Sequence, residues 1–341
     1  MRGFAPIPTA LPSYPGNGRR AFSPAGRLRH DYCVSGIYEE PELYELACAY
    51  RDIPAEVTAL LAWYATHFEG GARPADPGLA QGLQGTGVRS VLELAAGPAE
   101  HARELARRGL RAAALDRSAA MCSYAAAQAK AADVDLQVVE ADMRDFTING
   151  PDGARVVFDS AIAMLNSLCH LFTLDDLVRH LTAVRAHLVP GGLYIVELAH
   201  PADFFAPVPR TSSEWTIDAP GVHAEVHWGA RSDRIDPLTQ VTNEHMSITA
   251  TASDGTIRTV SDVVPNRFWT LTEFTAAIAL ANAALAGARQ ASAAPRAADD
   301  VAPEPDGASA GFTLVETYGD FDETTALDAP TAWRMILILR A

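Results

Sequence analysis

Cysteine is scarce in this sequence, with four residues in 341 and no C-x-x-C pair. Such scattered cysteines argue against a disulfide framework and a zinc site, so we expect reduced thiols, a cytoplasmic location and no metal. The chain also lacks an apolar run near the ~20 residues that cross a bilayer. Its N-terminal segment has no apolar signal core. We therefore expect neither an export signal nor a membrane partner.

The chain also has little positive charge. Lys and Arg total 27 against 42 Asp and Glu, which gives a formal net charge of −15. Nucleic-acid-binding proteins usually present a basic face, so we expect no nucleic-acid partner and favour a small-molecule acceptor. The basic cluster near the N-terminus lies within residues 1–36, which are rich in Pro, Gly, Ser and Arg. We predict this aperiodic segment to be a disordered tail.

Residues 91–117 contain the most informative pattern, VLELAAGPAEHARELARRGLRAAALDR. An apolar run, a turn at residues 95–98, a helix to residue 108 and a second apolar run ending at Asp116 follow one another. This order is typical of the first unit of a nucleotide-binding α/β sheet. The helix amides face an anionic group, and an acid at the end of the second strand can accept both hydroxyls of a ribose.

Glycine is nearly missing from that turn. A dinucleotide-binding fold uses G-x-G-x-x-G, which lets the backbone approach a pyrophosphate. Here only Gly97 is present, flanked by alanines and a proline. Such a turn is poor for a pyrophosphate and adequate for a carboxylate and a thioether. A nicotinamide-dependent oxidoreductase is therefore the less favoured alternative, and a non-catalytic scaffold of the same fold is another.

Five short motifs occur in a fixed order along the chain. They are Glu93–Ala99, Asp116, Asp142-Met143-Arg144, Phe158-Asp159 with Asn166-Ser167, and Leu188–Gly192. In this order the chain resembles the class I S-adenosylmethionine-dependent methyltransferases that act on small molecules. The resemblance implies S-adenosyl-L-methionine as cofactor and an α/β, Rossmann-like, doubly wound seven-stranded sheet whose last strand is antiparallel. It also implies in-line transfer of a methyl group to an O or N atom, which we place in specialised metabolism.

Periodicity and turn residues divide the rest of the chain. We predict an N-terminal helical lid over residues 37–84 and the cofactor-binding core over 85–200. Strict alternation near residues 222–231, a turn and a returning strand predict an antiparallel β insertion over 201–266. This insertion would cap the acceptor or form a homodimer contact. Residues 267–341 would supply a return helix, a flexible loop at 287–310 and the last two core strands.

The resemblance implies a set of cofactor-binding residues. Asp142 would reach the adenine amino group, Met143 would pack on the adenine ring, and Arg51 would pair with the cofactor's carboxylate. The full predicted set is Tyr44, Arg51, Glu93, Ala95, Gly97, Asp116, Arg117, Met121, Asp142, Met143, Met164 and Leu165.

Acceptor and catalytic residues are predicted from their position, because ligands of open α/β sheets lie outside the carboxyl ends of the strands. His170 is the first candidate for a general base, with Asn166 orienting it. The predicted acceptor-binding residues are Tyr38, Ser167, His200, His245 and Trp269.

The segment His223–His227 has the pattern H-x-E-x-H. It differs from the H-E-x-x-H of metalloprotease helices. On a strand its three polar side chains share a face, and a metal site with His245 is one option. A polar pocket wall or a solvated sheet face is the favoured interpretation.

Overall fold

The computed structural model describes residues 36–71, 85–205, 212–292 and 311–341. Apart from Gly36, which begins the 3-10 helix η1 (Gly36–Glu39), the predicted tail lies outside the described residues. The same holds for residues 293–310 of the predicted flexible loop and for residues 72–84 of the predicted lid.

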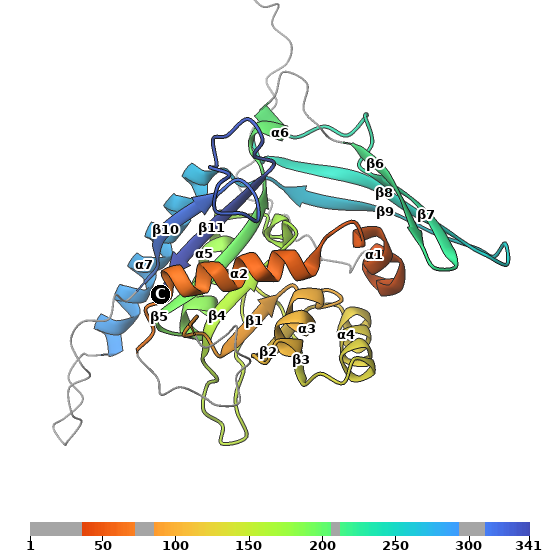
Figure 1. Cartoon of the computed structure of the whole chain (residues 1–341). Coiled ribbons are helices and arrows are strands. Elements are labelled where there is room, and N and C mark those ends of the chain that lie inside the picture. The colour runs from red at the N-terminus through yellow and green to blue at the C-terminus, as the bar shows by residue number, and fades with distance from the viewer. Residues whose placement is uncertain (1–35, 72–84, 206–211, 293–310) are drawn as a thin grey trace, which may run out of the picture. The chain divides into compact units, whose positions relative to one another are not determined.

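A seven-stranded sheet forms the centre of the fold, in the order β10-β11-β5-β4-β1-β2-β3 (Figure 1). Neighbouring strands are parallel except that β11 runs antiparallel to both β5 and β10. The predicted fold class is therefore confirmed. The strands are β1 (Ser90–Leu94), β2 (Arg111–Asp116), β3 (Leu136–Glu140), β4 (Phe158–Ala163), β5 (Leu188–Ala199), β10 (Thr313–Tyr318) and β11 (Arg334–Arg340).

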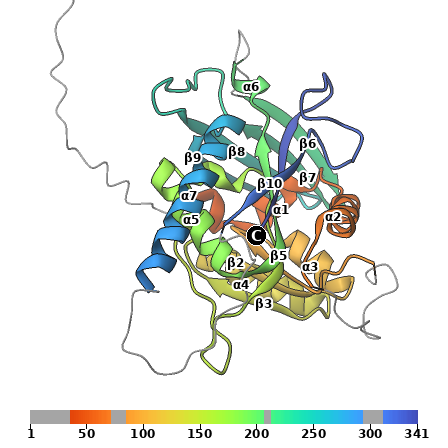
Figure 2. The same ribbon diagram turned by 90° about the vertical axis from the view of Figure 1, so that its left-hand side faces the viewer.

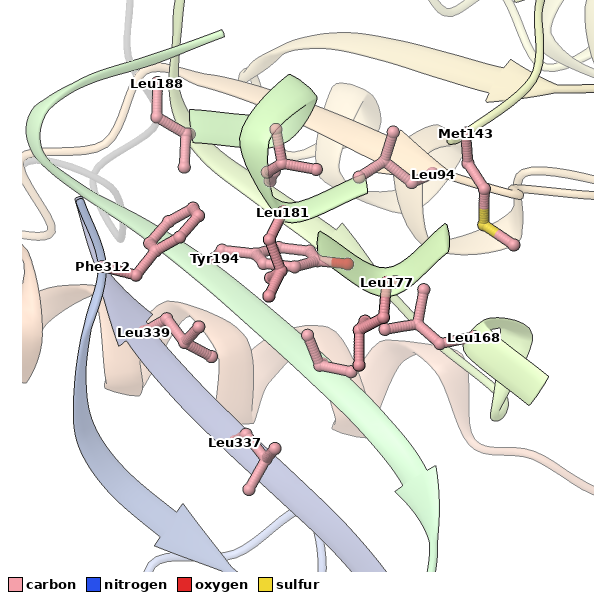
Figure 3. Packing of buried hydrophobic residues seen from close by; sticks show 14 of the residues in the cluster. Leu94, Met143, Leu168, Leu177, Leu181, Leu188, Tyr194, Phe312, Leu337 and Leu339 are labelled. Carbon is pink, nitrogen blue, oxygen red and sulfur yellow. The ribbon is translucent and has the colours of Figure 1, made fainter. Parts of the chain in front are cut away.

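Helices cover both faces of this sheet, with α5 and α7 on one face and α2 and α3 on the other (Figure 2). Alternate residues of the buried strands serve the two faces, so Leu92 and Leu94 pack with α5 while Val91 packs with α2. Figure 3 shows Leu177 and Leu181 of α5 against Tyr194 of β5. The helices are α1 (Pro41–Cys48), α2 (Ile53–His67), α3 (Glu100–Arg107), α4 (Ala119–Ala131), α5 (Leu174–Ala186), α6 (Ala202–Phe205) and α7 (Leu271–Ser292), with the 3-10 helix η3 (Ser167–His170).

Helix starts follow the sequence closely. The Ser118 hydroxyl accepts a hydrogen bond from the Met121 amide at 3.1 Å and caps α4. Thr173 and Asp176 form a capping box at the start of α5. Thr270 and Glu273 exchange the equivalent bonds at the start of α7. These polar caps fix where each helix begins, and they were recognisable from residue type and spacing.

A second, antiparallel sheet has the order β6-β7-β8-β9 and comprises β6 (Ser213–Ala219), β7 (Val222–Trp228), β8 (Val241–Ala252) and β9 (Ile257–Arg267). Its inner face packs on η1 and α1 through residues such as Val226, Ile248 and Leu43. Helix α1 lies between this sheet and α3 and α4 (Figure 1). The predicted insertion is therefore a sheet, and it includes β6, a strand that the alternation near residues 222–231 did not predict.

Two boundaries differ from those expected. The residues Pro190-Gly191-Gly192 predict a turn before the fifth strand, but β5 begins at Leu188 and passes through them. Gly191 has φ +75°, and its amide donates to the Ala341 carbonyl at 2.7 Å. Strand β11 pairs with β5 and leads the chain end back to this point. Helix α7 continues to Ser292, so residues 287–292 of the predicted loop are helical. Alanine has the highest helix propensity, and this segment is rich in it.

Helix α7 also qualifies the expectation about apolar runs. Its segment Leu271–Gln290 has a mean hydropathy of 1.4, which is enough by length and composition to cross a membrane. Phe274, Ala277 and Ala281 of this helix are nevertheless buried in the core beside α5. A mostly buried core helix of a soluble protein passes the same test, but only 22% of this window is buried, so the absence of a membrane partner stays a prediction.

Candidate active site

The turn that follows β1 is built from left-handed backbone. Ala95, Gly97 and Ala99 have φ of +48°, +52° and +59°. Glycine adopts this region freely, whereas alanine is strained there, and such strain clusters at functional sites. Because Ala99 is left-handed, α3 begins at Glu100, two residues later than predicted. The turn is closed by the Gly97 amide, which donates to Asp116 Oδ2 at 2.8 Å.

A pocket opens beside this turn, at the carboxyl ends of β1 and β4. Its empty volume is about 410 Å³ including the open solvent at its mouth. Eight of the predicted site residues line it, namely Tyr44, Arg51, Glu93, Ala95, Gly97, Met164, Leu165 and Ser167. The other lining residues are Cys48, Ile53, Ala96, Pro98, Glu100 and His101.

Arg51 reaches this pocket from the corner between α1 and α2. Its side chain is 2% exposed, and Nη2 donates to Glu56 at 2.5 Å and to Glu197 at 2.8 Å. Its Nη1 is buried and has no hydrogen-bond partner among the described residues. A buried donor without a partner costs free energy. This orphaned donor is suited to a carboxylate that would arrive with a ligand.

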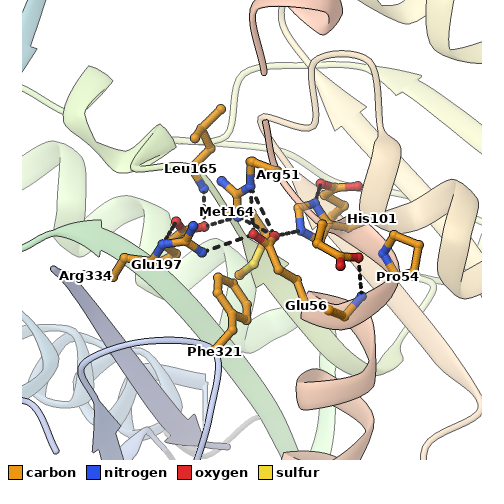
Figure 4. Close-up of polar contacts among 12 residues, drawn as sticks. Arg51, Pro54, Glu56, His101, Met164, Leu165, Glu197, Phe321 and Arg334 are labelled. Carbon is orange, nitrogen blue, oxygen red and sulfur yellow. Dashed lines mark hydrogen bonds and ion pairs between the residues drawn. The ribbon is translucent and has the colours of Figure 1, made fainter. Parts of the chain in front are cut away.

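A buried network of charges surrounds Arg51 (Figure 4). Glu56 also binds His101 Nε2 at 2.8 Å and Arg334 Nη1 at 3.1 Å. Burial alone would lower the pKa of His101, but its hydrogen bonds to Glu56 and Glu93 outweigh burial and raise that pKa to about 9. The pKa of Glu56 falls to about 2 against the opposing effect of burial, because His101 and Arg51 donate to it. The network is therefore ionised at neutral pH.

Glu197 connects two walls of the pocket. One carboxylate oxygen, Oε2, accepts from Arg51 Nη2 at 2.8 Å and from the Leu165 amide at 2.7 Å. Leu165 has φ +51°, so this bond helps to hold a strained backbone at the end of β4. The sequence analysis did not single out Glu56, His101, Glu197 or Arg334. They come from elements far apart in the chain and have no shared motif.

Two acids on the α3 side of the pocket differ in their surroundings. Glu93 Oε2 accepts from the Ala102 amide at 2.8 Å, and its Oε1 lies 3.4 Å from His101 Nδ1. Glu100 is partly buried and makes no hydrogen bond or ion pair with the described residues. Burial, followed by the charge of Glu45, raises the pKa of Glu100 to about 7. The Glu93 carboxylate thus supports the fold of the site, while that of Glu100 has no partner among the described residues.

Asp116 lies at the end of β2, as predicted. Its Oδ2 accepts from the Gly97 amide and its Oδ1 from the Ser118 amide, both at 2.8 Å. Burial raises its pKa despite these bonds. Neighbouring Arg117 is exposed, and Met121 is 1% exposed beneath the turn. The two amides fix the orientation of the carboxylate, whose remaining lone pairs suit hydroxyl donors.

Asp142 and Met143 lie beyond the residues that line the pocket. Arg144 Nε donates to both oxygens of Asp142 at 3.0 Å, and Nη2 donates at 2.5 Å. Burial opposes ionisation, but these bonds from Arg144 lower the pKa of Asp142. The Met143 side chain is 8% exposed and packs in the core cluster of α5. The predicted adenine contacts therefore stay a prediction.

His170 forms a pair with Tyr38. Its Nε2 lies 2.9 Å from the Tyr38 hydroxyl, and its ring also bonds to the Pro265 carbonyl. Burial, and to a lesser extent Arg117, lowers the pKa of His170 to about 4. The predicted orienting residue Asn166 instead accepts from the Ala199 amide at 3.1 Å. The predicted pair of His170 and Asn166 is thus replaced by His170 and Tyr38.

Three predicted acceptor-binding residues lie elsewhere. His200 Nε2 bonds to the Leu327 carbonyl at 2.9 Å and caps a loop. His245 is on the outer face of β8, 60% exposed, and binds Asp233 at 2.6 Å. Trp269 is 3% exposed in the core, with Nε1 donating to the Leu168 carbonyl at 3.1 Å. None of the three lines the described pocket, because proximity in sequence to a strand end does not fix the face of a side chain, and their role toward the acceptor stays a prediction.

The inner face of the second sheet holds an acid that the sequence analysis missed. Glu244 of β8 is 8% exposed and accepts from Asn266 Nδ2 at 2.6 Å. Burial raises its pKa to about 7. Burial and the charge of Glu244 raise the pKa of Cys169, which places this acid beside η3. The strand period could have found it, because Glu244 has the same parity as Met246 and Ile248.

The H-x-E-x-H segment lies on the opposite face. His223, Glu225 and His227 are exposed, and the two histidines pair with Asp218 and Glu214 across β6. Among the described residues there is no group of three or more potential metal ligands. The favoured interpretation, a solvated sheet face, agrees with this exposure.

Known proteins resemble this chain in sequence over one segment and in fold over most of its length. Residues 91–192 match the family model described as a methyltransferase domain. A S-adenosylmethionine-dependent methyltransferase from Clostridium acetobutylicum is similar over 89% of this chain and 96% of its own, with TM-score 0.59 and 14% identity. The sugar N-methyltransferase KedS8 from Streptoalloteichus is similar over 93% and 98%, with TM-score 0.57 and 18% identity. No curated protein matches the sequence.

A third solved structure has the same arrangement. CalS10, an amino pentose methyltransferase from Micromonospora echinaspora, is similar over 88% of this chain and 97% of its own, with TM-score 0.56 and 16% identity. At these identities the solved structures establish the fold, while the family model establishes the domain. The match over residues 91–192 supports the predicted methyltransferase activity, and the solved structures confirm the predicted fold.

Proposed function

We propose that this chain methylates an amine nitrogen of a small-molecule acceptor such as an amino sugar. The observation that carries the proposal is the buried Glu244 carboxylate beside Cys169 of η3, whose first residue Ser167 lines the pocket. A buried acid without a cationic partner suits an ammonium ligand. The fold neighbours named as a sugar N-methyltransferase and an amino pentose methyltransferase support the same acceptor class.

The cofactor would lie in the pocket at the turn after β1. Arg51 Nη1 would bind its carboxylate, and Asp116 would accept the ribose hydroxyls. Asp142 and Met143 remain the proposed adenine contacts. The fit rests on the orphaned Arg51 donor and on the left-handed turn that leaves backbone exposed at Gly97. When bound, S-adenosylmethionine supplies a methyl group on a positively charged sulfur. An amine lone pair would attack the methyl carbon in line, and the sulfur would leave as a neutral thioether.

The protein's task is to present that lone pair. With its proton on Nδ1, His170 donates to the Pro265 carbonyl and its Nε2 accepts from the Tyr38 hydroxyl. The Tyr38 oxygen is then oriented to accept an N–H of the acceptor. Because the pKa of His170 is about 4, it is a weak base at neutral pH. Glu244, with a pKa of about 7, is better matched to hold the acceptor's proton.

The test is a methyl-transfer assay with amino sugars and matched sugars that carry a hydroxyl in place of the amine. We expect methylated product from the amines only. Replacing Glu244 with Gln should lower kcat/KM for the amine by about 100-fold, the usual contribution of a positioned acid or base, without changing cofactor affinity. Glu225→Gln on the solvated face of the same sheet is the matched control and should leave kcat/KM unchanged.

The pH profile gives an independent check. Ionised Glu244 accepts the acceptor's proton, so kcat/KM should rise with pH through about 7 and the rise should be lost in Glu244→Gln. Equal methylation of the hydroxyl sugars would favour O-transfer instead. Cofactor binding with no transfer to any acceptor would favour the non-catalytic scaffold. A cytoplasmic location, the absence of a nucleic-acid partner, a role in specialised metabolism and a homodimer through residues 201–266 remain further predictions.

A further inference from the structure

Glu100 is the one acid lining the pocket for which the described part of the chain provides no partner. Glu93, the other acid there, is bonded to the Ala102 amide. Glu100 is the first residue of α3 and follows the strained turn at Ala99. It has no hydrogen bond or ion pair with any described residue. A partly buried carboxylate in this condition has lost water without gaining a donor, which is unfavourable unless a ligand supplies one.

The surroundings of Glu100 are predominantly negative. The charged and titratable groups that face it from α1, β1 and α3 are Glu45, Cys48, Glu93, His101 and Arg103. Arg103 is engaged by Glu45, and His101 by Glu56 and Glu93. The two nearby cations therefore already have partners. The described residues around Glu100 therefore provide no free positively charged donor for its carboxylate.

Arg51 presents the complementary deficiency in the same pocket. In the described part of the chain its Nη1 has no acceptor, and the Glu100 carboxylate has no donor. An amino-acid group carries both charges, a carboxylate and an α-ammonium, on one carbon. We propose that Glu100 binds the α-ammonium group of the cofactor's methionine moiety, opposite Arg51, which binds its carboxylate. This inference rests on the proposed cofactor site and adds a residue that the sequence motifs did not indicate.

The inference is tested by calorimetric titration with three ligands. S-adenosylhomocysteine carries both charged groups, its decarboxylated analogue S-adenosyl-3-thiopropylamine carries only the ammonium, and 5′-methylthioadenosine carries neither. Glu100→Gln should weaken the first two by about tenfold, the scale of one charge-assisted hydrogen bond, and leave 5′-methylthioadenosine unchanged. Arg51→Lys should weaken S-adenosylhomocysteine alone. Glu104→Gln, one turn further along α3 and paired with Arg107, is the control for removing a charge from this helix.

Proton release provides a second measurement that needs no variant. Pairing with an ammonium favours the ionised carboxylate, so the pKa of Glu100 should fall from about 7 when ligand binds. Titrations of the wild-type chain at pH 7 in buffers of different ionisation enthalpy should then show release of about half a proton with S-adenosylhomocysteine. No release is expected with 5′-methylthioadenosine, and none in Glu100→Gln.

The outcomes separate this inference from the proposed function. If the wild-type chain binds none of the three ligands, the cofactor site itself is wrong. If it binds S-adenosylhomocysteine but Glu100→Gln binds it equally well, Glu100 does not contact the ammonium. Equal weakening of all three ligands by Glu100→Gln, or binding of S-adenosylhomocysteine without proton release, would also overturn the assignment.

Discussion

The two sides of the site use opposite electrostatics. On the cofactor side, Arg51, Glu56, His101 and Glu197 form buried ion pairs and are charged at neutral pH. On the acceptor side, His170 and Tyr38 are neutral, and Glu244 is near its midpoint of ionisation. Fixed charges suit a ligand whose charges never change. Groups that are neutral or half ionised suit an acceptor that must lose a proton. We therefore propose that the charged side binds the cofactor and that the other side takes part in proton transfer.

The largest effect is expected from removing one of the fixed charges on the cofactor side. Arg51→Met should leave Glu56 and Glu197 buried without their main partner, and lower the free energy of unfolding by about 3 kcal/mol. Affinity for S-adenosylhomocysteine should fall at least about 100-fold. Chemical denaturation and calorimetry measure the two effects. Arg107→Met, which removes an exposed partner of Glu104, should change neither.

A smaller effect is expected when one ion pair of the network is weakened and its other hydrogen bonds are kept. Glu197→Gln keeps an acceptor for the Leu165 amide but weakens the grip on Arg51. We expect cofactor affinity to fall about tenfold, since a hydrogen bond between charged groups contributes ~1.5–3 kcal/mol. The KM for the acceptor should change little. Equal losses for cofactor and acceptor would mean that Glu197 supports the whole pocket rather than its cofactor side.

The two sides of the site also differ in how well they could be predicted from the sequence. The turn at Gly97 and the acid Asp116 lie on contiguous motifs, and parallel strands bring their carboxyl ends together, so these were predictable. The ion network joins residues such as Glu56 and Arg334, whose hydrogen bond spans most of the chain. No local pattern encodes such a pairing. It is formed only when α2, β5 and β11 pack together.

The acceptor side was predicted less well because residue type alone does not give orientation. Trp269 is an aromatic residue of the kind that lines pockets, but its side chain lies in the core. Its Nε1 donates to the Leu168 carbonyl, and Arg267 Cζ lies 3.7 Å from the centre of its ring. His245 is among the predicted acceptor-binding residues, whereas its neighbour Glu244 is not. The two-residue period of β8 places Glu244 inward and His245 outward. Applying that period to every polar residue of the insertion would have reversed the choice.

The smallest expected effect concerns the turn that both sides share. Ala95 has φ +48° and a partly exposed side chain, whereas a glycine adopts this conformation without strain. Ala95→Gly should therefore raise the free energy of unfolding by about 0.5–1 kcal/mol. Relief of ~1–2 kcal/mol of left-handed strain outweighs the entropic cost of ordering a glycine. Thermal unfolding measures this, with Ala96→Gly in the same turn as the control that should not stabilise. A destabilised Ala95→Gly variant would show that the methyl group's packing against the core cluster outweighs its backbone strain.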